Sequence, residues 1–163
     1  MNRVFFTIIA ILMATHAMAD TFTYDIQQAG YDFDQYDLKG EATFEIFIEE
    51  FRKYPWREQV GNNKGGSEPT ISVRNPNTDI DLWVSVVGTS EDFAYLLGIV
   101  QPKTIKTMFG FGKEKQVAWV TAYVLEKPEW VEEAFDLYFK GNIETLNSKL
   151  SDLPVFLEQE AAN

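Results

Sequence analysis

The side chains that could do chemistry in this 163-residue sequence are mainly carboxylates, because cysteine is absent and the only histidine, His16, lies in a predicted N-terminal leader. The lack of cysteine and of a histidine outside the leader excludes Ser-His-Asp and Cys-His catalysis. It also excludes Cys/His zinc sites, haem ligation by these residues and iron–sulfur clusters. Glu45, Glu49 and Glu50 invite comparison with the paired carboxylates of glycosidases. Nothing in the sequence indicates that these carboxylates are buried, and a raised carboxyl pKa requires burial. A carboxylate-only hydrolase is therefore the weakest hypothesis.

Two acidic segments have oxygen-rich side chains that could bind calcium. Asp32, Asp34 and Asp37 lack the third oxygen ligand, the glycine and the glutamate that an EF-hand loop requires. Residues 75–81 carry Ile80 where the glycine should be. The glycine-rich segment 61–67 lacks the Gly-Lys-Ser/Thr ending of a phosphate-binding loop. We therefore predict no metal site and no cofactor.

An aromatic platform is a first candidate binding surface. A predicted strand over residues 117–125 places its large side chains on one face and its small ones on the other, and the small face suits close helix packing. If strand 81–87 presents its tryptophan and serine on the same side as the large face, the platform consists of Trp83, Ser85, Trp119, Thr121 and Tyr123. In the alternative, which the abundance of aromatic residues in cores favours, the N-terminal Phe22, Tyr24 and Phe33 cover this face.

A basic segment between two predicted strands, residues 103–115, is the second candidate. It holds four lysines and one acid in a chain that is otherwise strongly acidic. A hairpin tip of this composition could contact a partner or a membrane surface, through Met108, Phe109, Phe111, Lys103, Lys106 and Lys113. In the alternative, both phenylalanines fold back on the sheet and the lysines are solvated.

Hydrophobic periodicity predicts the elements that would position these residues. Phe44, Phe47, Ile48 and Phe51 form one helical stripe within residues 41–54, and Pro55 ends that helix. Period-two patterns predict strands over residues 21–26, 70–73, 81–87, 93–100 and 117–125. Two helices follow, from Pro128 to Gly141 and from Asn142 to Pro154. We expect an α+β domain with an antiparallel meander of four to five strands, its N-terminal and two C-terminal helices packed mainly on one face.

The first 19 residues have the pattern of a cleaved secretory signal peptide. Arg3 precedes the apolar run Val4–Ala14, and Ala17-Met18-Ala19 is a small-x-small cleavage site. A membrane anchor, the competing interpretation, would need about 20 apolar residues. We therefore expect an exported protein, in a bacterial periplasm, with one domain over residues 20–163.

Net charge limits the partners. The formal charge is −11 and becomes −12 when Arg3 leaves with the leader, which argues against nucleic acid. An acidic surface attracts a basic protein, and masking a partner needs no catalytic group. We expect a non-enzymatic protein-binding role, as an immunity protein or inhibitor that masks an envelope-targeting toxin or wall hydrolase. The alternative is a small-ligand or envelope-surface binding domain, with peripheral membrane contact but no stable anchor. We make no prediction of oligomeric state.

Overall fold

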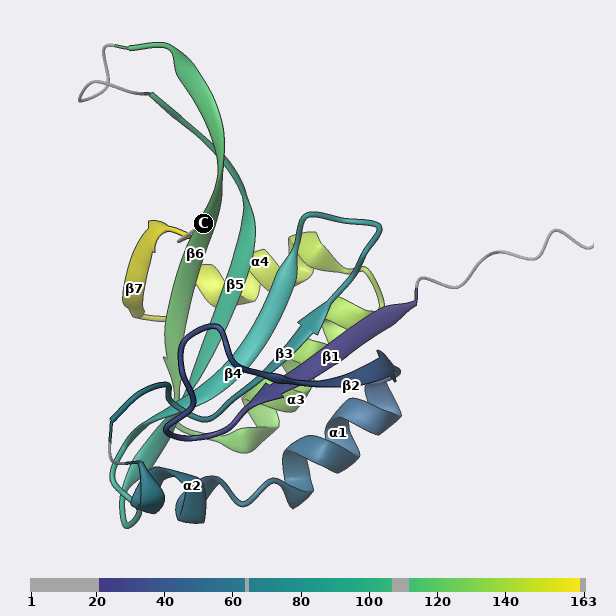
Figure 1. The fold of residues 1–163 in the computed structure, drawn as a ribbon. Helices are drawn as coiled ribbons and strands as arrows, with labels where there is room; N and C mark the ends of the chain where they lie inside the picture. Colours follow the sequence, from purple (N-terminus) through teal and green to yellow (C-terminus); the bar gives the residue numbers. More distant parts are fainter. Residues whose placement is uncertain (1–20, 64, 107–111, 162–163) are drawn as a thin grey trace, which may run out of the picture.

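The computed structural model describes residues 21–63, 65–106 and 112–161, and it shows one mixed helix and strand architecture (Figure 1). The strands are β1 (Phe22–Gln27), β2 (Asp37–Ala42), β3 (Thr70–Arg74), β4 (Asp81–Gly88), β5 (Phe93–Lys106), β6 (Glu114–Leu125) and β7 (Val155–Glu160). The helices are α1 (Phe44–Lys53), α2 (Trp56–Asn62), α3 (Pro128–Phe139) and α4 (Ile143–Ser151). The predicted α+β class is confirmed, but the sheet has seven strands instead of four to five.

All the strands belong to one antiparallel sheet in the order β2-β1-β3-β4-β5-β6-β7. The expected meander is its centre, where β3 to β6 follow one another in chain order. The β5–β6 hairpin extends well beyond the neighbouring strands (Figure 1). The sheet therefore has a wide body and a projecting two-stranded arm, with β7 paired to the outer side of β6.

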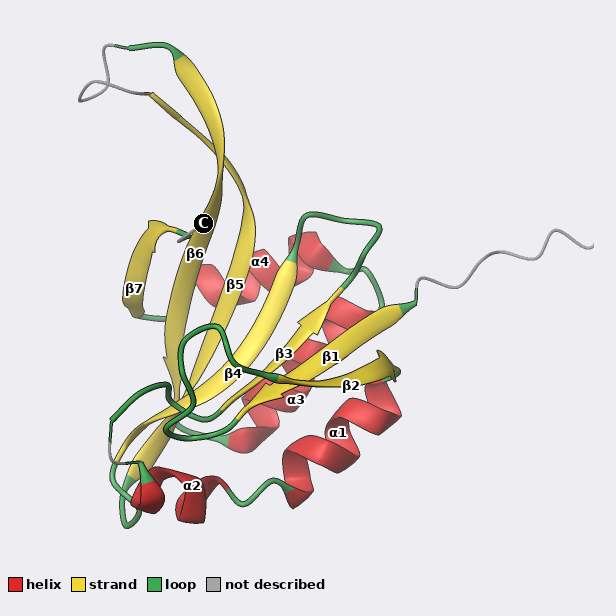
Figure 2. Cartoon of the chain, viewed as in Figure 1, coloured by secondary structure: helices red, strands yellow, loops and turns green. Residues whose placement is uncertain are grey.

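Three helices, α1, α3 and α4, lie on one face of the sheet, while the short α2 lies near one end (Figure 2). The predicted stripe of α1 faces the core, where Phe47, Ile48 and Phe51 are buried. Thr43 caps this helix by accepting a hydrogen bond from the Ile46 amide at 3.3 Å. The Phe47 ring stacks on Phe135 of α3 with ring centroids 3.8 Å apart, so the two helices meet in the core.

Three elements were not predicted, each because its local pattern is weak. Strand β2 contains Lys39 and Gly40, residues that strands disfavour. Helix α2 has seven residues, including a glycine, and lacks a full apolar stripe. Strand β7 is exposed along its whole length, so it shows no alternation between buried and polar positions.

The predicted signal peptide, residues 1–19, lies outside the described residues. Within the part of the chain that is described, no helix is long and apolar enough to cross a membrane.

Candidate binding surface

The sheet face opposite the three helices is the candidate binding surface, and we call it the open face. Leu82, Val84 and Val86 of β4 are fully buried in the helix-side core, so Trp83 and Ser85 between them point to the open face. Paired residues of neighbouring strands share a face. The register therefore continues one row across six strands of the open face: Asp25, Ser72, Trp83, Gly98, Ala122 and Leu157.

The small residues in this row make room for a tryptophan laid against the sheet. A β-carbon added at Gly98 would overlap the Trp83 indole ring, so the ring rests directly on the Gly98 backbone. Ala122, the next residue across the sheet, is also buried. Gly98 thus accommodates a flat aromatic side chain, and Ala122 lies beside it on the open face, where we had expected the small residues of residues 117–125 to receive a helix.

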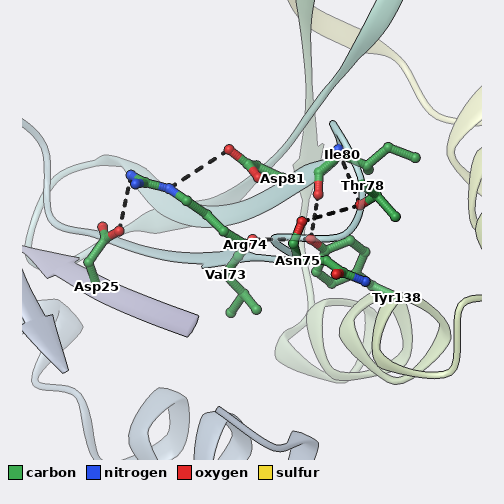
Figure 3. A network of polar contacts seen from close by, with 8 residues as sticks. All are labelled: Asp25, Val73, Arg74, Asn75, Thr78, Ile80, Asp81 and Tyr138. Carbon is green, nitrogen blue, oxygen red and sulfur yellow. Dashed lines mark hydrogen bonds and ion pairs between the residues drawn. The ribbon is translucent and has the colours of Figure 1, made fainter. Parts of the chain in front are cut away.

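At the polar end of the open face, Arg74 lies between two carboxylates and contacts both (Figure 3). Its Nη2 lies 3.1 Å from Oδ2 of Asp25, and its Nε lies 3.8 Å from Oδ2 of Asp81. Its guanidinium carbon lies 5.7 Å from the centre of the Tyr36 ring, a cation–π contact. The Asp25 side chain is 7% exposed, so Arg74 compensates a carboxylate that is almost out of solvent.

A tight turn brings Arg74 and Asp81 together at the ends of β3 and β4. The Asn75 carbonyl accepts the Thr78 amide at 3.1 Å, which closes the turn. Tyr138 of α3 donates its hydroxyl to the Ile80 carbonyl at 2.6 Å, which fixes the turn from the helix side (Figure 3). The position of Arg74 is therefore set by the hairpin and by a helix beneath it.

Burial raises the pKa of the Asp25 carboxyl, and Arg74 and a hydrogen bond from Ser72 oppose this only in part. Burial also raises the pKa of Asp81, where Arg74 opposes the shift and Asp25 adds to it. A raised pKa is a property of general acids, but Asp25 is nearly inaccessible and tied to Arg74. This geometry favours a structural role for Asp25. In the described part of the chain, His, Cys, Asp and Glu form no group able to hold a metal ion.

The raised pKa of Asp25 predicts a pH dependence of stability. A carboxyl whose pKa is higher in the folded state stabilises the fold fully below its unfolded value, near 3.8, and this contribution is lost as pH rises through the folded value. We expect the stability of the wild type relative to Asp25→Asn to fall as pH rises from 3.8 toward neutrality, by less than about 1.4 kcal/mol per pH unit. Urea unfolding of both proteins across this range measures it, and parallel pH curves would contradict the prediction.

The other end of the open face is apolar. The register places three valines and two leucines on this side of β5, β6 and β7; Leu157 is 37% exposed and the other four are half-buried. We call them the apolar strip: Leu96, Val100, Val120, Val124 and Leu157. In Figure 2, no helix lies over this face of β5, β6 and β7. An uncovered group of apolar side chains beside a polar cluster is typical of a protein contact surface.

The expected platform does not form, because its members lie on opposite faces of the sheet. Thr121 and Tyr123 pair with Ile99 and Leu97, which are buried under the helices, and Trp119 shares their alternation. Trp83 and Ser85 point the other way. The expected cover does not form either: Phe22 and Tyr24 belong to the helix-side core, and Phe33 is exposed.

Of the five platform residues, Trp83 is the one on the open face with partial exposure. Ser85 is buried and donates its hydroxyl to the Pro69 carbonyl at 2.9 Å. Thr121 is buried, and Tyr123 packs against the core. Trp119 is half-buried and donates its indole N–H to Glu158 of β7 at 2.9 Å.

Two lysines of the expected basic segment lie on the arm and contact β7. Lys103 lies 2.7 Å from Glu158 and 3.9 Å from the centre of the Trp119 ring, and Lys115 lies 3.2 Å from Glu160. These two lysines therefore hold β7 against the arm. Lys106 and Lys113 are exposed near its end. The predicted tip residues Met108, Phe109 and Phe111 lie outside the described residues, so their binding role stays a prediction.

A hollow away from the open face lies between α3, α4 and the end of β6. It has a volume of about 250 Å³ and is lined mainly by apolar side chains, among them Trp130, Leu137 and Leu153. Ligand pockets usually measure about 300–1,000 Å³. This hollow is therefore smaller than a usual ligand pocket.

Sequence reasoning missed Arg74, Asp25 and Asp81. A signal for one pair was present, because Arg74 and Asp81 lie where the predicted strands 70–73 and 81–87 face each other, and the ends of a hairpin are cross-strand neighbours. Asp25 could not be added, since the pairing of β1 with β3 joins segments far apart in the chain.

Comparisons of this chain with protein-family models, with curated proteins and with solved structures find no match. We therefore infer the function from the geometry of the open face.

Proposed function

We propose that this is an exported, non-enzymatic binding protein that holds a basic protein partner on its open face. Our best assignment within that class is an immunity protein or inhibitor that masks an envelope-targeting toxin or a wall hydrolase. The observation that carries the proposal is the uncovered apolar strip beside the Arg74 cluster. Export to the periplasm is proposed from the N-terminal pattern of residues 1–19 alone.

Charge supports a basic partner. The chain has 25 acidic and 14 basic side chains, so its field attracts a positive protein and repels a second copy of itself. Such a field speeds encounter, while apolar contacts at the centre of an interface supply most of the affinity. The charge of the whole chain supplies the first of these effects, and the apolar strip of the open face supplies the second.

The test is capture followed by an activity assay. The protein, purified after export, is used as bait at low and moderate salt against lysate and secreted protein of its own strain. We expect one dominant, near-stoichiometric basic protein, bound less tightly as salt rises because screening weakens charge attraction. We also expect that protein's toxic or wall-degrading activity to be blocked at equimolar bait.

Two results would contradict the proposal. One is the absence of any stoichiometric partner at either salt concentration. The other is a captured partner whose activity is unchanged by equimolar bait, which would remove the masking role.

A further inference from the structure

The two edges of the sheet are built differently. At one edge, β2 carries a bulge at Lys39 and has Gly40 in a left-handed conformation, with φ of 97°. Bulges and lysines are devices that protect an edge from pairing with another strand. At the other edge, β7 also carries a bulge, at Phe156, but it has no lysine or proline and its pairing with β6 is regular from Leu157 to Glu160. The regular segment of β7 beyond its bulge, from Leu157 to Glu160, is thus the less protected of the two edges.

Hydrogen bonding shows which backbone groups of β7 are free to accept a strand. The Ala161 amide donates to the Ala118 carbonyl of β6 at 2.9 Å. Backbone groups of alternate residues point to opposite sides of a strand. Gln159 therefore points toward β6 like Ala161, whereas the N–H and C=O groups of Glu158 and Glu160 point to the outer edge. No described strand pairs with β7 on that side.

The outer edge is held in an extended conformation before any partner arrives. Glu158 accepts hydrogen bonds from Lys103 at 2.7 Å and Trp119 at 2.9 Å, and Glu160 accepts one from Lys115 at 3.2 Å. These contacts join β7 to both strands of the arm. A preformed edge lowers the ordering cost of binding.

The side chains of β7 specify the chemistry of a segment that would pair with it. Leu157 and Gln159 lie on the open face, where Leu157 continues the apolar strip. Glu158 and Glu160 lie on the opposite side. Cross-strand neighbours share a face, so apolar side chains of an added strand would extend the apolar strip. Alternate basic ones would lie beside the two glutamates and share them with Lys103 and Lys115. The excess of acidic residues in the chain disfavours a second copy here.

We propose that β7 binds an extended segment of the partner by strand addition, and that this segment alternates apolar with basic residues. The proposal rests on the proposed function, and it adds the mode of docking and the chemistry of the docked segment. Main-chain hydrogen bonds to Glu158 and Glu160 supply the pairing, and alternating side chains supply specificity.

Amide hydrogen exchange tests strand addition directly. The probe is an end-blocked heptapeptide of alternating Lys and Val, and its control is the matched peptide of alternating Glu and Val. We expect saturating basic peptide to slow exchange of the Glu158 and Glu160 amides at least about tenfold, because each gains a hydrogen bond. The Gln159 amide, which points to β6, is expected to change little, and the acidic peptide should have no effect.

A matched pair of variants isolates the outer N–H. Glu158→Ala removes the carboxylate and keeps the amide, whereas Glu158→Pro also removes an N–H that does not pair with β6. We expect Glu158→Pro to bind the basic peptide about fivefold more weakly than Glu158→Ala. The amide spectrum of each variant reports whether β7 still pairs with β6, and Glu160→Pro against Glu160→Ala repeats the comparison at a second outer amide.

Three results would overturn strand addition: no slowing at saturating basic peptide, equal slowing by the acidic peptide, or protection that rises with protein concentration when no peptide is present. A captured partner that binds the proline and alanine variants equally would also overturn it while leaving the proposed function in place. Peptide binding without any captured partner would instead remove the proposed function alone.

Discussion

Replacing Phe135 with alanine is expected to lower the free energy of unfolding by about 4 kcal/mol. The Phe135 side chain is 0% exposed, and its ring stacks on Phe47 with centroids 3.8 Å apart. Truncation removes buried apolar surface and leaves a cavity where α1 and α3 meet over the sheet. Urea unfolding of the variant and the wild type measures the difference.

Phe33→Ala is the matched control, because it removes the same atoms from a side chain that is 87% exposed. We expect it to change stability by less than about 0.5 kcal/mol. Similar losses at Phe33 and Phe135 would contradict the assignment of the core to the helix-side face of the sheet.

Gly98→Ala is expected to lower the free energy of unfolding by about 3 kcal/mol, the upper part of the usual range for overpacking. The reason is steric: the added methyl group would occupy the place of the Trp83 indole ring, which lies against the Gly98 backbone. Either the ring leaves the sheet or the strands β4 and β5 shift apart. Near-ultraviolet circular dichroism and urea unfolding together report the ring environment and the energy.

A double-mutant cycle separates this steric effect from a general glycine effect. In a Trp83→Ala background the ring is gone, so Gly98→Ala is expected to cost less than about 1 kcal/mol. An equal cost in both backgrounds would show that Trp83 does not rest on Gly98, and the arrangement of the open face would be wrong there.

The central elements of the fold could be predicted because their patterns are strong. The α1 stripe of Phe47, Ile48 and Phe51 is buried as expected, and strands β3 to β6 form the expected meander. The edge strands β2 and β7 were missed for one physical reason. In both strands the local pattern is weak, because β2 contains Lys39 and Gly40 and β7 has no buried side.

The candidate site could be predicted only in part. Alternation correctly grouped Trp119, Thr121 and Tyr123 on one face of β6, but it does not say which face the helices cover. Residue size suggested that the small face meets the helices, whereas Gly98 and Ala122 lie on the opposite, open face with Trp83. The register between strands decides which face of β6 the helices cover, and that register depends on tertiary pairing.

The central claim is that the partner binds the open face, and a pair of matched substitutions tests it most directly. Val120→Lys places a charge in the apolar strip, and Ile46→Lys places the same charge on α1, on the helix side, where Ile46 is 43% exposed. The measurement is the affinity of each variant for the captured basic protein, with circular dichroism confirming that both variants fold. We predict at least about tenfold weaker binding for Val120→Lys and less than about twofold for Ile46→Lys. Equal affinities, or a larger loss for Ile46→Lys, would contradict the claim.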